Sequence, residues 1–199
     1  MSTDEHRCDQ ELWEAAVIGE ADAFGELFER HHVLIYNFCF RRTGSWSIAE
    51  DLMAVVFLEA WRTRRGMQLN DGSLLPWLYA IATNVTRHQH RSTGRHRAAL
   101  ARVASRVTNV PDHADEIIDR ISDEQRMREV LGAFTRLPQR ERDVLELSAF
   151  ARLDYAQIAA VLEIPVGTVR SRLSRGRSRL RGIVDDIDRY DDEIKEAQP

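Results

Sequence analysis

The residues with the clearest chemistry are a row of arginines near the C-terminus. Between Ile164 and Val184 there is no acidic residue. The charged side chains of this stretch are Arg170, Arg172, Arg175, Arg177, Arg179 and Arg181. Surface helices usually mix both signs of charge, so a purely cationic stretch favours a polyanionic partner over a merely solvated face. Arginine binds phosphate and pairs with guanine, which makes DNA the predicted partner.

These arginines follow a predicted pair of short helices. Asp154 and Gln157 have the types and spacing of an N-cap and its reciprocal partner, and Ile158 and Leu162 continue at helical spacing. Pro165 is expected to end the first helix and open the second, because the residue before a proline is pushed out of the α region. A tight turn followed by a cationic helix is typical of a helix-turn-helix whose second helix enters the major groove.

A second basic group lies in the N-terminal half. Asn84, Arg87, His88 and Arg91 are spaced so that they share one helix face. Such a stripe beside a polar loop suits a displaced single strand of DNA with one base turned out of the stack. The alternative for Asn84 is a buried amide with satisfied hydrogen bonds.

The formal net charge of −4 conceals a segregation of charge along the chain. Basic residues gather in 87–110 and 164–184, while acidic residues dominate 112–124 and 185–196. Local patches, rather than the global sum, decide contact with phosphate. We expect the acidic tail to fold over a basic face of the free protein, with a strength that falls as salt rises.

The fold class expected is all-α, because no segment sustains a period of two. We expect two small helical domains joined by a flexible linker, with the helix-turn-helix in the C-terminal domain. The predicted limits are 8–97 for the first domain, 98–119 for the linker, 120–184 for the second domain and 185–199 for the acidic tail.

The third predicted helix is the most apolar. It is expected to run from Ile48 to about Arg64, with Ser47 and Glu50 forming a capping box at its start. Its apolar residues are Leu52, Val55, Val56, Phe57, Leu58, Ala60 and Trp61. They cover more than one face, so this helix lies at the centre of a bundle or is covered by a partner.

Several features exclude other classes of protein. The sequence has no glycine-rich phosphate loop, no His-Glu-x-x-His and no Cys-x-x-Cys, so neither catalysis, a cofactor nor a metal is expected. Cys8 and Cys39 are too few for a disulfide framework. The N-terminus lacks the apolar core of a secretory signal, and no apolar run approaches the length needed to cross a bilayer. A cytoplasmic location without membrane insertion is expected.

Several motifs occur together in one order. They are Ala49-Glu50-Asp51-Leu52, Phe57-Leu58-Glu59-Ala60-Trp61-Arg62, Trp77-Leu78-Tyr79-Ala80-Ile81-Ala82-Thr83-Asn84, Leu137-Pro138 with Arg140 and Arg142, Ile158-Ala159, and the run from Ile164 to Leu173. With these motifs the chain resembles an extracytoplasmic-function (ECF) class sigma factor of bacterial RNA polymerase, over nearly its full length.

The resemblance implies a protein that binds core RNA polymerase and directs promoter-specific initiation without being an enzyme. Its implied partners are the clamp of the β′ subunit, the flap of the β subunit and promoter DNA, with an anti-sigma factor as a further one. For the −35 element it implies Thr168, Arg170, Ser171, Arg172, Ser174 and Arg175. For the −10 element it implies Asn84, Arg87, His88 and Arg91. For core polymerase it implies Asp51, Ala54, Val55 and Glu59.

The chain departs from the family pattern where that pattern commonly has Gln-Glu, because Ala54-Val55 stand there. Docking is therefore expected to rely on apolar contact together with Asp51 and Glu59. Two other interpretations stay open: a stand-alone helix-turn-helix repressor or activator, and a pure interaction protein. Binding of promoter DNA alone, only with core polymerase, or not at all separates the three.

Overall fold

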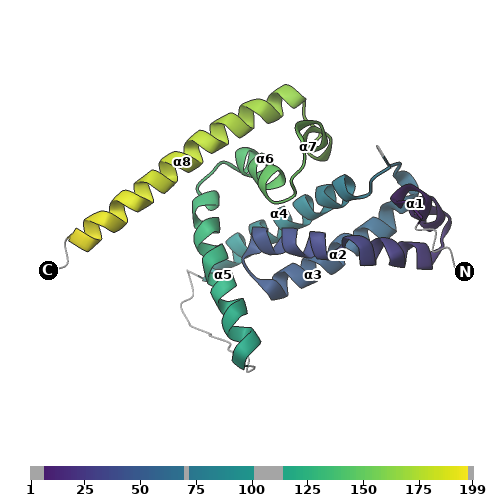
Figure 1. Cartoon of the computed structure of the whole chain (residues 1–199), viewed down its shortest axis with the longest axis horizontal. Helices are drawn as coiled ribbons and strands as arrows, with labels where there is room; N and C mark the ends of the chain where they lie inside the picture. Colours follow the sequence, from purple (N-terminus) through teal and green to yellow (C-terminus); the bar gives the residue numbers. More distant parts are fainter. Residues whose placement is uncertain (1–6, 70–71, 101–113, 197–199) are drawn as a thin grey trace, which may run out of the picture.

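The computed structural model describes residues 7–69, 72–100 and 114–196, with side chains described for 7–69, 72–91 and 122–185. Within these residues all regular structure is helical, as expected (Figure 1). The elements are α1 (Asp9–Ile18), α2 (Ala21–Thr43), α3 (Trp46–Thr63), a 3-10 turn (Arg64–Gly66), α4 (Leu75–Leu100), α5 (Ala114–Thr135), α6 (Gln139–Ala149), α7 (Tyr155–Leu162) and α8 (Val166–Glu196). None of the described helices is both long and apolar enough to span a membrane.

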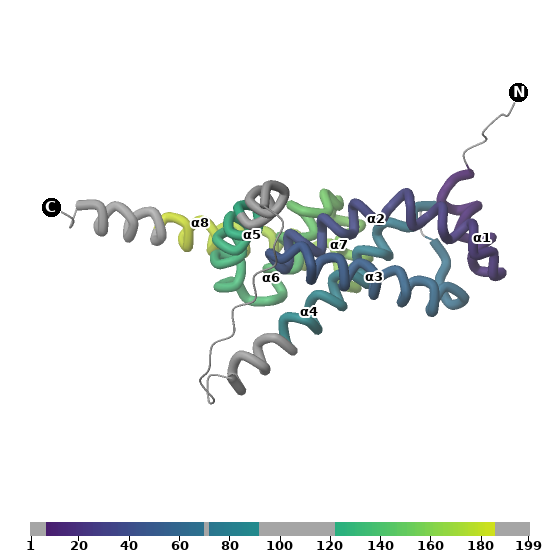
Figure 2. The backbone as a smooth tube through the Cα atoms, turned by 90° about the horizontal axis from the view of Figure 1, so that it is seen from below, coloured from purple at the N-terminus to yellow at the C-terminus, as the bar shows by residue number. Residues whose placement is uncertain are grey.

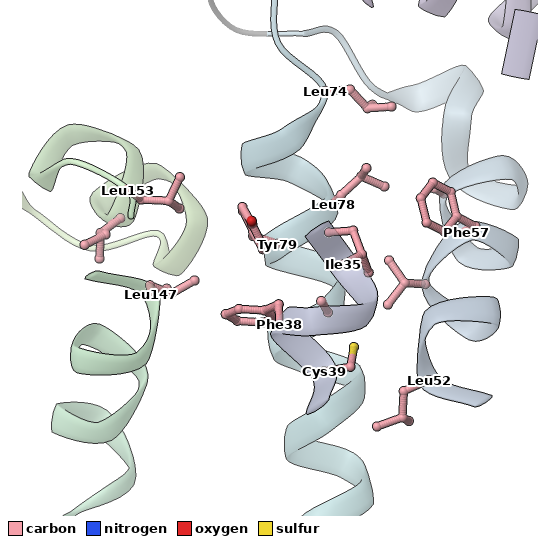
Figure 3. Close-up of a cluster of buried hydrophobic side chains, with 14 of the residues drawn as sticks. Ile35, Phe38, Cys39, Leu52, Phe57, Leu74, Leu78, Tyr79, Leu147 and Leu153 are labelled. Atoms are coloured by element: carbon pink, nitrogen blue, oxygen red, sulfur yellow. The ribbon is translucent and has the colours of Figure 1, made fainter. Parts of the chain in front are cut away.

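The core of the first domain lies between α2, α3 and α4. Ile35 and Cys39 from α2 belong to the same buried apolar cluster as Phe57 of α3 and Leu78 of α4 (Figure 3). Burial raises the pKa of Cys39 to about 12, so its thiol stays neutral and packs as a small apolar group. The α2 helix ends at Gly44, whose φ of 64° is the left-handed conformation that glycine adopts without a Cβ clash.

A partly buried polar cluster around Asp9 holds α1 against this core. Asp9 accepts hydrogen bonds from Arg30 at 2.8 Å and from the backbone N–H of Leu74 at 3.3 Å, and its other partner, His31, lies at 2.7 Å. Burial alone would raise the Asp9 pKa, but the bonds from Arg30 and His31 outweigh it and lower that pKa. Asp9 therefore joins α1, α2 and the start of α4.

The prediction of a capping box at Ser47 and Glu50 is wrong. The α3 helix begins earlier, at Trp46, and Ser45 at its N-cap makes no side-chain hydrogen bond. The Trp46 N–H instead donates to the Glu124 carboxylate at 2.9 Å. A helix start needs an acceptor for its first N–H groups, and here α5 of the second domain supplies one.

The second domain comprises α5 to α8. The α8 helix is continuous from Val166 to Glu196, so the residues of the acidic tail prolong the cationic helix. A continuous helix cannot turn its C-terminal half back over its N-terminal half. The expected folding of the tail over the cationic face of α8 is therefore not observed.

The two domains pack against each other. In both views α5 lies across the C-terminal end of α2 (Figures 1 and 2). Leu147 and Leu153 face Phe38 and Tyr79 across the junction (Figure 3). We call this arrangement the closed form. The expected flexible linker, 98–119, overlaps the end of α4, which runs to Leu100, and the start of α5 at Ala114, and residues 101–113 lie outside the described part of the chain.

Candidate nucleic-acid interface

The helix-turn-helix is formed by α7 and α8. Asp154 accepts from the Gln157 N–H at 2.8 Å, and the Gln157 side chain accepts from the Asp154 N–H at 3.0 Å, so the predicted reciprocal cap is present. The first helix ends at Leu162, earlier than expected from Pro165 alone. Glu163 takes a left-handed conformation with φ of 53°, and this residue, together with the proline, makes the turn.

One face of α8 is held against the rest of its domain. Val169 and Leu173 are buried. Gly176 lies so close to α6 that an added Cβ would stand 2.8 Å from Cδ1 of Leu145. A residue without a side chain at this point lets the two helices approach closely, which fixes the orientation of the opposite face of α8.

Helical spacing divides the arginines of α8 into two rows. The outer row holds Arg170, Arg177 and Arg181, all exposed. The inner row holds Arg172, Arg175 and Arg179 and lines a hollow beside the start of α6. Between the rows is a strip of exposed small residues: Gly167, Ser171, Ser178 and Gly182. A helix built in this way can approach the floor of a groove while its arginines reach the walls.

Glu141 of α6 distinguishes the two rows. Its carboxylate accepts from Arg179 at 3.0 and 3.1 Å and lies 3.7 Å from Nε of Arg175. Both arginines remain more than half exposed, so these pairs orient side chains more than they stabilise the fold. The sequence shows an acid-free stretch, but the fold adds an acid from a neighbouring helix.

The residues expected to contact core polymerase lie on α3. Asp51 and Ala54 are exposed, Val55 is 40% exposed, and Glu59 pairs with Arg62 at 2.8 Å. Leu58, in the same exposed region, has 64% of its surface accessible. The apolar side chains of α3 therefore exceed what the closed form covers, as its sequence pattern indicates.

A groove of about 620 Å³ runs between α3 and α4. Val55 and Glu59 line one wall, and Asn84 and His88 line the other. The structure thus brings residues expected to contact polymerase and residues expected to contact −10 DNA to the two sides of one groove. Asn84 is exposed, which excludes the alternative of a buried amide.

Arg87 points away from this groove toward the second domain. Its Nη2 and Nε donate to the Asp143 carboxylate at 2.7 and 3.1 Å, and its Nη1 donates to Asn84 at 3.2 Å. Arg91 is exposed on the next turn. Arg87, which is expected at the −10 element, is therefore bound to a carboxylate of α6 in the closed form.

Sequence reasoning missed Arg42, which is 1% exposed at the end of α2. Its Nη2 donates to Asp143 at 3.0 Å, and its Nη1 lies 2.8 Å from Glu146. A charged residue at the end of a helix ordinarily indicates exposure and a favourable dipole interaction, so nothing in the local pattern indicates burial. Only the packing of α6 against α2 shows it.

Two family models and several known proteins match the sequence of this chain. Residues 27–96 match the family model of sigma-70 region 2, and residues 127–180 match that of sigma-70 region 4. The chain is 29% identical over 175 residues to the ECF RNA polymerase sigma factor SigW of Bacillus subtilis, covering 85% of this chain and 92% of SigW. It is 31% identical over 170 residues to the RNA polymerase sigma factor CarQ of Myxococcus xanthus, covering 85% of this chain and 94% of CarQ.

Two solved structures share the fold. CnrH, in complex with the cytosolic domain of CnrY, superposes with a TM-score of 0.66 at 22% identity, covering 90% of this chain and 99% of CnrH. The sigma factor RpoE from Bartonella quintana, in complex with the anti-sigma factor NepR, gives 0.57 at 22% identity, covering 81% of this chain and 96% of RpoE.

Region 2 on one helical unit and region 4 on a second one define a sigma factor of the sigma-70 type. The identity to relatives over nearly their whole length shows that this chain belongs to the ECF class of RNA polymerase sigma factors, which direct transcription initiation. Sigma factors are initiation factors rather than enzymes.

Proposed function

We propose that α8 reads the −35 element of the promoter. The observation that carries this proposal is the exposed face of α8, where Arg170 and Ser171 lie in the first turns while Val169 is buried behind them. The first turns of a recognition helix are the part that reaches base edges. Thr168, Arg172, Ser174 and Arg175 flank them, and the later arginines contact phosphate, which sets affinity rather than sequence preference.

The first domain binds the −10 element through Asn84, Arg87, His88 and Arg91. Three of these side chains are exposed along α4, and two line the groove beside α3. A groove of this kind, with amide and imidazole groups on its wall, suits an unstacked base of the displaced strand. Arg87 completes the site by binding a phosphate.

Core polymerase docks on the opposite wall of that groove. Val55 and Leu58 supply exposed apolar surface, and Asp51 and Glu59 supply charge at its edges. We assign this surface to the clamp of the β′ subunit and the second domain to the flap of the β subunit. An anti-sigma factor would cover the same apolar surface, because a shared docking site prevents assembly with polymerase. The chain then acts in the cytoplasm, where polymerase is found.

Run-off transcription with purified core polymerase and a promoter library tests this function. We expect transcripts to start at a fixed distance downstream of a shared pair of sequence elements, and only when the chain is added. Binding to DNA without polymerase, with no new start sites, would instead favour the stand-alone repressor or activator.

A further inference from the structure

The junction between the domains is built around four charged side chains. Arg42 from α2 and Arg87 from α4 meet Asp143 and Glu146 from α6. The side chains of Arg42, Asp143 and Glu146 are at most 2% exposed. That of Arg87 is 27% exposed. Both cations come from the first domain and both acids from the second, so the cluster exists only in the closed form.

Asp143 joins the two arginines. Its Oδ1 accepts from Arg42 at 3.0 Å, and its Oδ2 accepts from Arg87 at 2.7 Å. One carboxylate thus lies between two guanidinium groups. A DNA phosphate offers two oxygens in a similar arrangement, and guanidinium groups bind phosphate and carboxylate by the same paired donors.

We propose that Arg42 and Arg87 form a phosphate-binding pair for promoter DNA, and that Asp143 and Glu146 occupy this pair in the closed form. DNA then binds the pair only after the second domain moves away. The inference rests on the proposed function, since that function assigns Arg87 to the −10 element. It adds Arg42 to the DNA-binding face and assigns an inhibitory contact to α6.

The cluster can open because it is held weakly for its degree of burial. Three of the four side chains are removed from water, and the pairing only partly returns the cost of that desolvation. Nε of Arg42 and Oε2 of Glu146 have no hydrogen-bond partner among the described residues, although Glu146 lies close to Arg42. The carboxylates therefore direct where α6 docks more than they stabilise the docking.

Contacts around the cluster explain how α6 is placed. Arg41 of α2 donates to the Phe150 carbonyl at 3.3 Å across the junction, while Gln139 donates to Asp143 at 2.9 Å within α6 and holds that carboxylate in place. Leu131 of α5 lies against Gly44, 3.2 Å from the position a Cβ would take. These contacts add to the apolar packing of Leu147 and Leu153 against Phe38 and Tyr79, so the second domain must release both kinds of contact to move away.

The test measures DNA binding and size of the full chain without polymerase. The probe is a fluorescein-labelled single-stranded DNA of mixed sequence, because phosphate contact does not depend on sequence. Asp143→Asn with Glu146→Gln removes both carboxylates. Asp123→Asn with Glu129→Gln is the matched control, since it removes the same charges from exposed positions on α5.

We expect the Asp143→Asn, Glu146→Gln variant to bind the probe about tenfold more tightly at low salt. The form in which the second domain has moved away is the one that binds DNA, and in the variant it is no longer a minor population. Its radius of gyration from X-ray scattering should rise, whereas the control should change neither quantity. Adding Arg42→Gln to the variant should abolish the gain in affinity while the chain stays extended. Adding Arg87→Gln should do the same, and this substitution is at a partly exposed position that tolerates it.

Equal dissociation constants for the variant and its control overturn the proposal, and so does a gain that survives both arginine substitutions. Run-off transcription is measured in parallel. Suppose the wild-type chain and the variant use the same start sites and bind the DNA probe equally. The proposal of an inhibitory contact is then contradicted, and the proposed function stands. If neither directs transcription, the proposed function itself fails.

Discussion

Residues of one type have different roles on the same helix. Arg170 is exposed at the start of α8, whereas Arg179 is bound to Glu141 at 3.0 Å. A guanidinium that is oriented by a carboxylate reaches a phosphate in a fixed direction. One that projects from the first turn is able to pair with a base edge. The position on the helix, rather than the residue type, separates specificity from affinity.

Arg170→Ala is expected to weaken transcription from promoters that depend on the −35 element and to relax preference at one base position. The loss should be about 1–3 kcal/mol of discrimination, the contribution of one bidentate contact with guanine. Transcription from a library of −35 sequences, read by sequencing, measures it. Arg177→Ala is the control and should lower transcription from all promoters alike. A uniform loss for Arg170→Ala as well would reassign Arg170 to phosphate.

At the scale of elements, α3 has two apolar faces. Leu52, Val56 and Phe57 are buried in the domain core, while Val55 and Leu58 are 40% and 64% exposed. A helix with more apolar surface than its own domain covers is typical of a docking site. Here the docking face is also one wall of the groove whose other wall carries Asn84.

Val55→Glu is expected to weaken binding to core polymerase at least about tenfold, because it buries a charge in an apolar contact. Helical content and melting temperature should change little, since Val55 lies outside the core. Competition binding with core polymerase, together with circular dichroism, checks both statements. Val130→Glu on α5, an equally exposed position at 46%, is the control. A large loss of thermal stability would place Val55 in the core instead.

At the scale of the whole molecule, the closed form should respond to pH. Burial raises the pKa of Glu146 to about 7. The negative charge of Asp143 also raises this pKa, whereas the positive charges of Arg42, Arg142 and Arg87 lower it. A raised carboxyl pKa means that the closed form loses stability as pH rises from about 4.5 to 7. Burial alone would raise the pKa of Asp143, but the bonds from Arg87 and Arg42 outweigh it and lower that pKa, so the stabilisation from Asp143 is lost only below 3.8.

His90 acts in the opposite direction to Glu146. Burial lowers its pKa and outweighs the contact of its Nε2 with the Arg42 carbonyl at 2.9 Å, which raises that pKa, so protonation below 6.5 disfavours the closed form. A comparison with Glu146→Gln isolates the glutamate. Between pH 5 and 7.5 wild type should lose roughly 1–3 kcal/mol more stability than the variant does. Urea unfolding of both proteins at both pH values measures the free energy of unfolding. If the difference between wild type and variant does not change with pH, the raised pKa of Glu146 is contradicted.

The sequence by itself determined the helical class, the reciprocal cap at Asp154 and the segregation of positive charge on α8. These features are local: a cap depends on residues three positions apart, and a helix face on the 3.6-residue repeat. The motifs that carry the resemblance to ECF sigma factors are likewise short and ordered along the chain. Such features can be read without knowing which helices meet.

Only the tertiary structure decided the contacts between segments distant in sequence. Glu124 supplies the acceptor at the start of α3, where the sequence favours Ser47. Glu141 pairs with an arginine of an acid-free stretch, and Arg42 is buried against Asp143, 101 residues away. Charge pairing depends on distance in space, and burial depends on which surfaces pack together. Neither follows from local pattern, so the inhibitory contact between the domains could be found only in the folded chain.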